Sequence, residues 1–544
     1  EAAMSGERVL VRLRPSPLTT RVRSGPFTAG LAQEIAGRLG GRSSRPLFPI
    51  DDRVAMNRSR TRPLLSHALP AEDQAFIRAR RRRYGLDRWI VLEIARVETV
   101  PRALKRLESH PLVEVVEPDY RGSAAGRRDE PAPNLLCAPN YPFYTPNDPL
   151  FFEQWYLDQS SDADIDMPEA WEIIRSALFV PVAVLDTGVD SEHPDLKEAL
   201  LPGWDFVNND SDPSDDEGHG SNVTGLLGAI GGNGKGIAGV AFRTSIIPVK
   251  ILDSNLFGYY SWWASGLYHA AELGARVINI SAGGEAYSQA LHNAVQYAHD
   301  RGAVIFAAMM NTDNDTLHYP AAFTETIAVG ATNHNDERAS PFVWGGGSSF
   351  GNHIDLVAPG DRLLSTYPGG SYASYSGTSQ ATPLASGVAA LMIQLDSDLS
   401  PEDIRSILRE TADDQVGRPT EDIPGFDIYH GAGRLNAEVA LAHVASTVTP
   451  PTVLEVYPPR PNPSRGLVVF VYDLVETGSV TLRIYDVRGR LVVTLLDGVV
   501  KPPGRWTHPW NGADSTGRMA PAGIYLYELI TGGRRVTGKL IRLK

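Results

Sequence analysis

Ser379 has surroundings that suit a reacting side chain. It lies in the segment Ser374–Gly387, SYSGTSQATPLASG, after a Gly-Thr pair and at the start of an apolar stretch. That stretch, Ala381–Leu395, carries apolar residues at helical spacing, so the sequence predicts a helix that begins near Ser379. The unpaired N–H groups and the dipole of a helix N-terminus favour nearby negative charge. A serine that only caps the helix would suit the same position equally well.

Two further residues supply what a serine hydroxyl needs in order to act as a nucleophile. The segment VAVLDTG places Asp186 at the end of an apolar strand, and Gly218-His219-Gly220 opens a helical segment. A histidine with a pKa near 7 can take the hydroxyl proton and return it later. A buried carboxylate fixes the tautomer of that histidine and stabilises its protonated form. The three residues together indicate nucleophilic catalysis.

Each of these residues also has a less specific interpretation. Asp-Thr-Gly occurs in aspartic proteases, but those enzymes need two carboxylates, and this chain has a single copy of the triplet. A lone histidine near a helix start is more often a capping or surface group than a catalyst. Only the combination of Asp, His and Ser in one domain favours catalysis.

The elements around these residues predict an α/β domain over residues 144–446. Short apolar strands alternate along the chain with segments of helical spacing, which is typical of a parallel sheet covered on both faces. In such proteins, the functional residues cluster at the carboxyl ends of the strands. The predicted strands are 182–185, 245–252, 276–281, 303–308 and 326–330, and the predicted helices are 220–229, 261–273 and 286–300.

The remaining sequence predicts two further domains and two linkers. Residues 1–120 predict a small α+β unit, and residues 121–143, rich in Gly, Ala, Arg and Pro, predict an exposed linker. Residues 447–459 are rich in Thr and Pro and predict a stiff linker, and residues 460–544 predict an all-β sandwich. The expected strands are 8–14, 88–95, 112–116, 468–474, 479–486, 490–496, 523–529 and 539–543, with a helix at 100–109.

Composition narrows the class of protein. At 544 residues the chain predicts three or four domains. Cys137 is the single cysteine, which excludes an internal disulfide. No apolar run reaches the roughly 18 residues that a membrane span needs. The sequence shows no charged-then-apolar leader, so we expect that any secretory signal has been removed or left out.

Charge is unevenly distributed along the chain. Residues 1–130 hold 25 Lys and Arg against 16 Asp and Glu, whereas the remainder holds 26 against 48. A basic N-terminal part and an acidic body predict electrostatic complementarity between the two. Nucleic-acid binding is the alternative, but the arginines are interleaved with strand-like apolar runs, so we expect no nucleic-acid partner.

Residues 144–445 resemble the subtilase (subtilisin-like serine protease) family, and within it the thermitase-like branch. The matching segments are VAVLDTGVD, HPDL, GWDFVNND, HGSNVTG, GIAGVA, VINISAGG, YPAAF, IAVGA, LVAPG, YSGTSQATP and GAGRLNA. The order Asp, His, Ser is the known order of the subtilisin triad. The resemblance implies an endopeptidase in which Asp186 orients the base, His219 is general base and acid, and Ser379 is the nucleophile. It also implies that Asn311 stabilises the oxyanion together with the Ser379 N–H.

The same resemblance implies a substrate-binding site with one unusual residue. Met310 stands where the family has a glycine, in one wall of the primary specificity pocket. We expect its side chain to narrow the pocket so that small residues are preferred, or to shift Asn311 if the backbone requires a positive φ. Gln380, Asn222 and Leu384 also depart from the family, and we expect them to alter packing only. The other implied substrate-binding residues are Gly258, which follows the unusually large Leu256-Phe257, and Ser281, Ala282, Gly283 and Gly284.

Calcium is the cofactor that the resemblance implies, and clustered oxygen ligands suit this hard cation. A second implied site, in the acidic run 205–212, could instead be a solvated acidic loop. The first site comprises Asp148, Asp195 and Asn233 with the backbone carbonyls of Ile230, Lys235 and Ile237, and the second comprises Asp205, Asp210 and Asp212.

The two ends of the chain carry weaker resemblances. Residues 8–120 resemble the family's N-terminal propeptide, which assists folding and blocks the active site until a cut, expected within 121–143, releases it. An unrelated accessory domain is the alternative. Residues 460–544 resemble the sorting domains of the type IX secretion system and related Ig-like modules of flagellar hook-capping proteins. Both readings of the tail imply an exported bacterial protein, secreted or at the cell surface.

The sequence therefore predicts a secreted, calcium-dependent serine endopeptidase that is made as a self-processed zymogen. Its expected partners are protein or peptide substrates, its own propeptide in cis and the type IX secretion machinery. The alternative is an inactive protease-fold protein with a binding role at the surface, for which Met310 is the main support. A third hypothesis, that the tail binds a polysaccharide or the cell wall, concerns targeting rather than chemistry.

Overall fold

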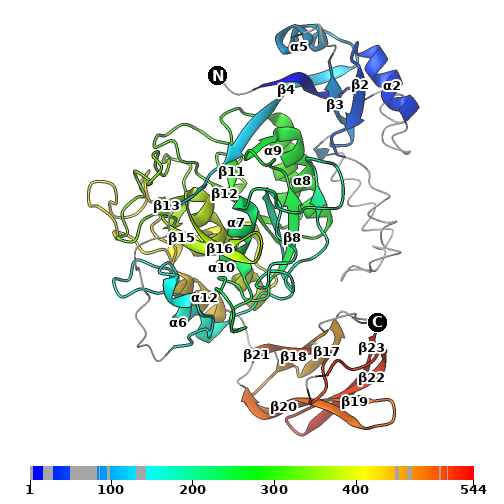
Figure 1. The fold of residues 1–544 in the computed structure, drawn as a ribbon, viewed down its shortest axis with the longest axis vertical. Helices are drawn as coiled ribbons and strands as arrows, with labels where there is room; N and C mark the ends of the chain where they lie inside the picture. The colour runs from blue at the N-terminus through cyan, green and yellow to red at the C-terminus, as the bar shows by residue number, and fades with distance from the viewer. Residues whose placement is uncertain are drawn as a thin grey trace. The chain divides into compact units, whose positions relative to one another are not determined.

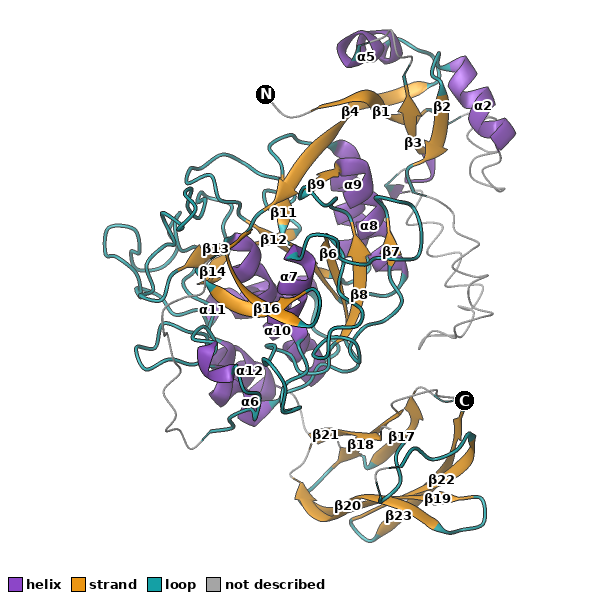
Figure 2. Cartoon of the chain, in the orientation of Figure 1, coloured by secondary structure: helices purple, strands orange, loops and turns teal. Residues whose placement is uncertain are grey.

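The computed structural model describes twelve parts of the chain in two compact units. The first unit comprises Glu1–Ile50 and Leu69–Ala445, and the second comprises Asp51–Ala68 and Ser446–Lys544. Figure 1 and Figure 2 show the elements of both units. The described residues are 4–15, 29–48, 83–84, 86–94, 99–129, 143–447, 453–460, 462, 468–501, 504–510, 512–516 and 518–543.

A seven-stranded sheet forms the centre of the first unit, in the order β14-β13-β12-β10-β6-β8-β7. Every neighbouring pair in it is parallel. Its inner strands are apolar and buried, as expected for a sheet covered on both faces, and the predicted α/β fold is confirmed. The strands are β6 (Pro181–Asp186), β7 (Trp204–Asp205), β8 (Ser245–Lys250), β10 (Val277–Ile280), β12 (Val304–Ala308), β13 (Thr326–Thr332) and β14 (Leu356–Pro359).

Helices cover this sheet and connect its strands (Figure 2). A large apolar core that includes Trp263, Leu267 and Val295 joins two of them, α8 and α9, to the sheet. Helix α10 is buried from Thr378 to Ile393, which explains why it is apolar on nearly every side. The helices are α6 (Met167–Ile173), α7 (His219–Gly228), α8 (Tyr260–Glu272), α9 (Gln289–Asp300), α10 (Thr378–Leu395), α11 (Pro401–Glu410) and α12 (Ala437–Thr447), with a 3-10 turn at Phe151–Glu153.

The N-terminal domain, residues 4–120 where described, is a small α+β unit. Its strands pair antiparallel in the order β4-β1-β3-β2, and an apolar core that includes Ile35, Ile90 and Leu107 joins them to two helices. The predicted α+β arrangement is therefore present. Its elements are β1 (Met4–Leu13), α2 (Ala29–Arg38), β2 (Ser43–Pro46), a 3-10 turn at Leu86–Arg88, β3 (Trp89–Glu93), α5 (Val100–Glu108) and β4 (Val113–Ala124).

Residues 121–129 differ from the exposed linker predicted for 121–143. Strand β4 runs on to Ala124 and pairs with β9 (Phe257–Tyr259) and β11 (Ala282–Gly283) of the central domain. A further strand, β5 (Arg127–Arg128), pairs with β16 (Ser371–Ser376), which forms a hairpin with β15 (Leu363–Tyr367). A Gly- and Arg-rich segment has no alternation that predicts a strand, and it is extended here because distant strands pair with it. Residues 130–142 of the predicted linker lie outside the described residues.

The second unit is a β-sandwich, as predicted. A three-stranded sheet, β17-β18-β21, and a four-stranded sheet, β20-β19-β22-β23, share one apolar core that includes Phe470, Leu482 and Leu529. The predicted linker 447–459 is corrected at its end, because β17 begins at Glu455. Strand β21 is not among the predicted strands. The strands are β17 (Glu455–Arg460), β18 (Val468–Leu474), β19 (Gly478–Asp486), β20 (Leu491–Lys501), β21 (Gly504–Trp510), β22 (Gly523–Thr531) and β23 (Arg534–Arg542).

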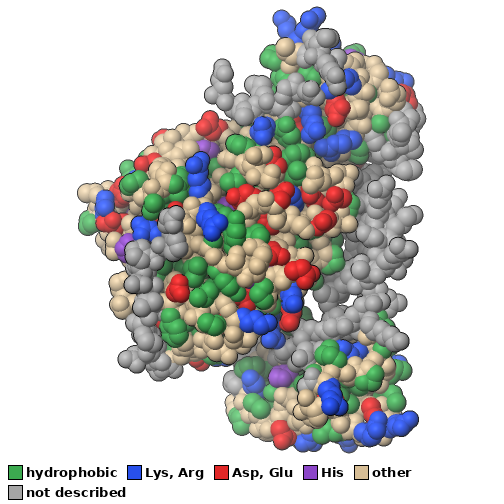
Figure 3. Space-filling model, in the orientation of Figure 1, with side chains coloured by type: hydrophobic (Ala, Val, Ile, Leu, Met, Phe, Trp, Pro, Cys, Tyr) green, Lys and Arg blue, Asp and Glu red, His purple; other side chains and the backbone are tan. Residues whose placement is uncertain are grey.

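The surface of the first unit follows the uneven charge of the sequence. On the face drawn in Figure 3, basic side chains are prominent over the N-terminal domain and acidic side chains gather over the central domain. Among the described residues, no helix is both long and apolar enough to cross a membrane.

Candidate active site

Asp186 and His219 meet at the carboxyl edge of the central sheet. Strand β6 ends at Asp186 and α7 begins at His219. The Nδ1 atom of His219 donates to Oδ1 of Asp186 at 2.7 Å, and both side chains are fully buried. Burial lowers the pKa of His219, but the charge and hydrogen bond of Asp186, with the charges of Glu217 and Asp215, outweigh it and raise this pKa above the usual 6.5. The pair can therefore hold a proton on the imidazole during a reaction.

Asp215 holds the start of α7 against the end of β6, and sequence reasoning missed this role. Its carboxylate accepts hydrogen bonds from the Thr187 hydroxyl at 2.8 Å and from the backbone N–H and hydroxyl of Ser221 at 2.8 and 2.6 Å. The Thr187 hydroxyl in turn accepts from the N–H of Gly220 at 2.8 Å. An aspartate three residues before a glycine at a helix start is the local signal that could have identified it.

Ser379 lies at the start of α10, as the helical spacing indicated. Its hydroxyl donates to the backbone carbonyl of Ser281 at 2.9 Å, whereas Nε2 of His219 has no hydrogen-bond partner among the described residues. Pro383 lacks an N–H group for the Ser379 carbonyl, and this carbonyl accepts instead from the Ser281 hydroxyl at 2.9 Å. The structure thus forms the Asp186–His219 bond but not a bond between His219 and Ser379.

Two donors converge on one backbone carbonyl oxygen, that of Ala125. The N–H of Ser379 donates to it at 2.9 Å and Nδ2 of Asn311 donates at 2.6 Å. The Thr378 N–H donates to Oδ1 of Asn311 at 3.0 Å and so fixes the orientation of the amide. Two preorganised donors aimed at one carbonyl oxygen form the arrangement that stabilises an oxyanion.

Strand β4 lies in the site as an extended peptide. Its residues Gly122, Ser123 and Ala124 pair antiparallel with strands of the central domain, and the Ala125 N–H donates to the Ser281 carbonyl at 3.0 Å. Of the predicted substrate-binding residues, Gly258, Ser281, Ala282 and Gly283 contact or pair with this segment. Gly284 does not pair with it, because its backbone pairs with Tyr319.

Met310 packs against Ala125. It forms a small buried cluster with Ala125 and Ala308. Its backbone adopts φ 74°, the left-handed region, which costs a non-glycine residue about 1–2 kcal/mol. Asn311 nevertheless keeps its hydrogen bond to Ala125. The contact of Met310 with Ala125 is compatible with the narrowed pocket, which stays a prediction.

Two acidic residues of β4 cap helices of the central domain, and sequence reasoning missed both. The Glu117 carboxylate accepts from the Ser288 hydroxyl at 2.7 Å and from the first N–H groups of α9 at 2.9 and 3.1 Å. Asp119 accepts from the N–H and hydroxyl of Ser261 in α8 at 3.0 and 2.8 Å. Burial raises the pKa of both carboxyls. Their sequence, Glu-Pro-Asp-Tyr after a strand, gives no signal of partners more than 140 residues away.

The first predicted calcium site brings its residues together. Asp148 and Asp195 are buried, and Asn233 donates from Nδ2 to Oδ1 of Asp195 at 2.9 Å and from its N–H to Oδ1 of Asp148 at 3.2 Å. Burial, and to a lesser extent the charge of Asp195, raises the pKa of Asp148. Two converging buried carboxylates with amide oxygens nearby fit a hard divalent cation. Ile230, Lys235 and Ile237 lie in or beside the same loop, where the Lys235 N–H bonds to Oδ1 of Asn233 and the Ile237 N–H bonds to Oδ2 of Asp195.

The second predicted calcium site is not assembled in the same way. Asp205 is buried, but its carboxylate accepts from the N–H groups of Val207 and Asn208 in its own loop. Asp210 and Asp212 are exposed, and each accepts hydrogen bonds from residues two positions further along the chain. Among the described residues, the set whose carboxylate and imidazole atoms lie close enough for one ion is instead Asp422, Asp427 and His430.

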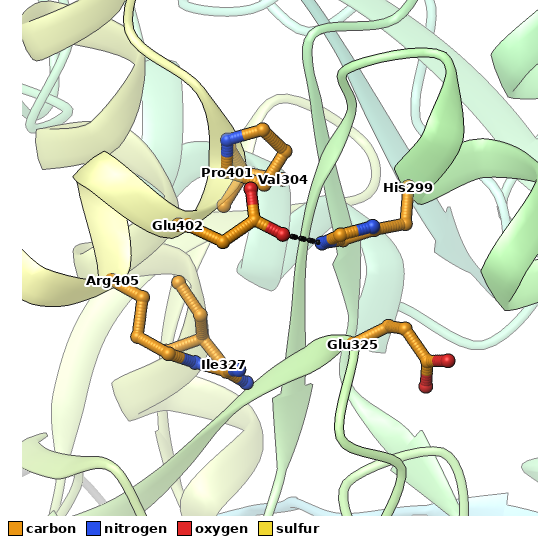
Figure 4. Close-up of a pocket in the computed structure, with 7 residues that line it drawn as sticks. All are labelled: His299, Val304, Glu325, Ile327, Pro401, Glu402 and Arg405. Carbon is orange, nitrogen blue, oxygen red and sulfur yellow. Dashed lines mark ion pairs between the residues drawn. The ribbon is translucent and has the colours of Figure 1, made fainter.

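A small pocket away from the catalytic residues is shown in Figure 4. His299 Nε2 forms an ion pair with Glu402 at 3.0 Å beside it. None of the catalytic, substrate-binding or calcium-site residues named above lines this pocket. Its lining residues are His299, Val304, Glu325, Ile327, Pro401, Glu402 and Arg405.

Known proteins share the central domain. Residues 180–433 match the model of the family described as Subtilase family. Thermitase of Thermoactinomyces vulgaris is 40% identical over 300 residues, which cover 55% of this chain and 100% of that protein. The thermophilic serine proteinase of Bacillus sp. (strain AK1) is 37% identical over 353 residues, 65% of this chain and 78% of the relative. Subtilisin E of Bacillus subtilis (strain 168) is 35% identical over 326 residues, which cover 59% of this chain and 81% of that protein.

The first of these relatives is covered over its whole length, at 40% identity. The chain belongs to the subtilase family and is a subtilisin-like serine endopeptidase.

Proposed function

We propose that this protein is an exported, calcium-dependent serine endopeptidase that is made as a zymogen and cleaves itself between Ala125 and Gly126. One observation carries the proposal: the Ala125 carbonyl accepts hydrogen bonds from both Asn311 and the Ser379 N–H. A carbonyl held in this way is the one that a nucleophile at Ser379 would attack. A Cβ built on Gly126 would lie 2.9 Å from both His219 Nε2 and Ser379 Cβ. The bond between Ala125 and Gly126 therefore faces both reacting groups.

The chemistry follows from these positions. The Ser379 hydroxyl turns from the Ser281 carbonyl, gives its proton to Nε2 of His219 and attacks the carbonyl carbon of Ala125. The negative charge that forms on the Ala125 oxygen is stabilised by Asn311 and by the Ser379 N–H. His219 then returns the proton to the nitrogen of Gly126 as the peptide bond breaks, and water later hydrolyses the acyl-enzyme.

The N-terminal domain would act as the inhibitor of the enzyme before and after this cut. It covers the site through β4, which pairs with two substrate-aligning strands, and through the helix caps made by Glu117 and Asp119. The cut leaves these contacts intact, since they all lie before Ala125. Release of the domain, and not cleavage alone, would therefore set free the active site.

Calcium would be held by Asp148, Asp195 and Asn233 with backbone carbonyls of the loop after α7. The ion would supply positive charge between two buried carboxylates and so stabilise the loop. The β-sandwich at residues 455–543 would serve export, as its resemblance to sorting domains suggests. Its absence from the matched family region, residues 180–433, fits a role separate from catalysis.

One observation favours the alternative of an inactive surface protein. The Ser379 hydroxyl bonds to Ser281 and not to His219. We favour the enzyme because a serine hydroxyl can be redirected by rotation about one bond, whereas the pair of donors on Ala125 must be built by the fold.

Self-processing of the full chain tests the proposal. The wild type and the Ser379→Ala variant are kept in calcium, and their fragments are identified by intact mass and N-terminal sequencing. We expect the wild type to yield a new N-terminus at Gly126 and the variant to stay whole. If both chains remain intact while folded, the inactive-protein alternative is correct. A Ser379-dependent cut elsewhere would keep the enzyme but refute the assigned bond.

A further inference from the structure

We infer that this protease selects substrates with arginine at the second and third residues after the scissile bond. The inference rests on the proposed function, because it takes residues 122–128 as the enzyme's first substrate. In this register Gly126 follows the scissile bond, and Arg127 and Arg128 occupy the next two positions. Each arginine lies on an aromatic ring of the central domain.

Backbone pairing fixes where these two side chains point. Strand β5 pairs antiparallel with β16, with Arg127 opposite Ser376 and Arg128 opposite Tyr375, and the Asp129 N–H donates to the Ser374 carbonyl at 2.8 Å. Successive side chains of a strand point to opposite faces. The two arginines must therefore meet different walls of the site.

The first wall is Trp344. The Cζ atom of Arg127 lies 5.2 Å from the centroid of this ring. Trp344 stacks in turn on Phe342, with ring centroids 5.1 Å apart and planes inclined by 17°, and Phe342 is buried. The indole is thus supported from within the domain and presents a face to the substrate, and tryptophan is the aromatic residue that binds cations most strongly.

The second wall is Tyr367, at the end of β15. The Cζ atom of Arg128 lies 4.6 Å from its ring centroid. The Tyr367 hydroxyl donates to the backbone carbonyl of Glu217 at 3.3 Å, and its ring packs so closely on Gly218 that a Cβ there would overlap it. The ring is therefore fixed beside the start of α7, where it contacts Glu217 and Gly218, the two residues before His219.

Charge and space near the scissile bond point in the same direction. The Tyr367 ring beneath Arg128 is bonded through its hydroxyl to the backbone of an acidic residue, Glu217. At Gly126, a Cβ would lie 2.5 Å from Oε1 of Gln380 and 2.9 Å from both His219 Nε2 and Ser379 Cβ, so a small residue fits best directly after the scissile bond. Selectivity on this side of the bond is then left to the two aromatic faces.

The exposure of the two arginines sets the size of the expected preference. Both arginines are exposed, and a guanidinium on an exposed aromatic face gains a factor of about 2–5 in affinity. We expect kcat/KM to favour arginine over glutamine at both positions by about 4- to 25-fold in total.

Four quenched fluorescent peptides test the inference. One copies residues 121–129, RGSAAGRRD, and the others carry glutamine in place of the first arginine after the glycine, the second, or both. They are given to the self-processed full chain after the released N-terminal domain has been separated. The enzymes are the wild type and the variants Trp344→Leu, Tyr367→Leu and Tyr367→Phe.

The ratio of kcat/KM between peptides within each enzyme is the readout, since it cancels general damage to the enzyme. Trp344→Leu should lose the preference at the second position only, and Tyr367→Leu at the third only. Tyr367→Phe keeps the ring and should keep the preference. Equal cleavage of all peptides by the wild type, or ratios unchanged in both leucine variants, would overturn the inference.

Two outcomes separate this inference from the proposed function. A chain that has processed itself but cleaves none of the peptides overturns the inference and leaves the proposed function standing. A chain that neither processes itself nor cleaves any peptide refutes the proposed function, and this inference with it.

Discussion

At the scale of single residues, the hydrogen bond between His219 and Asp186 should set the pH range in which Ser379 can react. His219 must be neutral to accept the serine proton. Its pKa is raised above the usual 6.5, because the charge and hydrogen bond of Asp186, with the charges of Glu217 and Asp215, outweigh the effect of burial. A raised pKa keeps the imidazole protonated, and hence unable to act as a base, up to a higher pH.

The rate of self-processing should therefore fall as the pH drops through a value above 6.5. Activity should be full at a pH above the raised pKa of His219 and should be lost at a pH below it. Asp186→Asn should cut the rate about 10⁴-fold and move the acid limb to lower pH. Processing rates of the intact chain across pH 5 to 9 would check this, and an acid limb at or below pH 6.5 in the wild type would contradict it.

Met310 is predicted to act at the same scale, on substrate choice. Its side chain packs on Ala125, and its left-handed backbone would suit glycine better. The residue thus fills space that a larger substrate side chain would need.

Met310→Gly should raise the ratio of cleavage after leucine to cleavage after alanine by about 10-fold or more, because the removed side chain leaves room for the larger residue. Met310→Leu keeps the bulk and is the matched control. A library of peptides that differ only in the residue before the scissile bond supplies the measurement. A wild type that already favours large aromatic residues there would show that Met310 does not narrow the pocket.

At the scale of elements, β4 joins two domains that each have their own core. Its first half pairs with β1 inside the N-terminal domain, and its end pairs with β9 and β11 of the central domain. Within the part that pairs with β1, Glu117 and Asp119 cap α9 and α8. Further contacts, such as the Ser265 hydroxyl donating to the Leu47 carbonyl at 2.7 Å, hold the same two domains together.

Removal of the Glu117 cap should loosen the start of α9. In the uncleaved Ser379→Ala chain, Glu117→Ala should speed hydrogen exchange of the first amides of α9 by about 2- to 30-fold, the equivalent of a lost helix cap. Glu108→Ala, at an exposed position of α5, is the control and should leave these amides unchanged. Equal exchange in both variants would mean that the carboxylate does not stabilise this helix end.

At the scale of the whole molecule, the loop after α7 ties together distant parts of the central domain. Asp148 lies before the first helix of that domain, Asp195 follows β6, and Tyr372 of β16 donates to Asp195 at 2.8 Å. An ion between the two carboxylates would strengthen all of these connections at once.

Calcium removal should therefore lower the Tm of the central domain by about 5 °C or more, the shift expected when a ligand at about 100 times its Kd is withdrawn. The Ser379→Ala background avoids self-digestion during the measurement. Asp195→Asn should abolish the dependence of Tm on calcium, whereas Asp212→Asn, in the second predicted set, should leave it. If Asp212→Asn abolished the dependence of Tm on calcium and Asp195→Asn did not, the ion would belong to the run 205–212.

The sequence alone determined the elements whose signals are local. Buried strands and helical spacing predicted the central sheet, and turn signals predicted the β-sandwich. The segments around Asp186, His219 and Ser379 identified three residues that the fold brings to one edge of the sheet. Each of these signals extends over about ten residues, so a single stretch of sequence contains it.

Only the tertiary structure decided what occupies the active site. Residues 121–129 resemble a linker, and their strands exist because partners more than 130 residues away supply the hydrogen bonds. The helix caps at Glu117 and Asp119, the direction of the Ser379 hydroxyl and the aromatic rings beneath Arg127 and Arg128 also depend on contacts between distant segments. Such contacts leave no periodicity in the sequence, because each depends on where the fold places the partner.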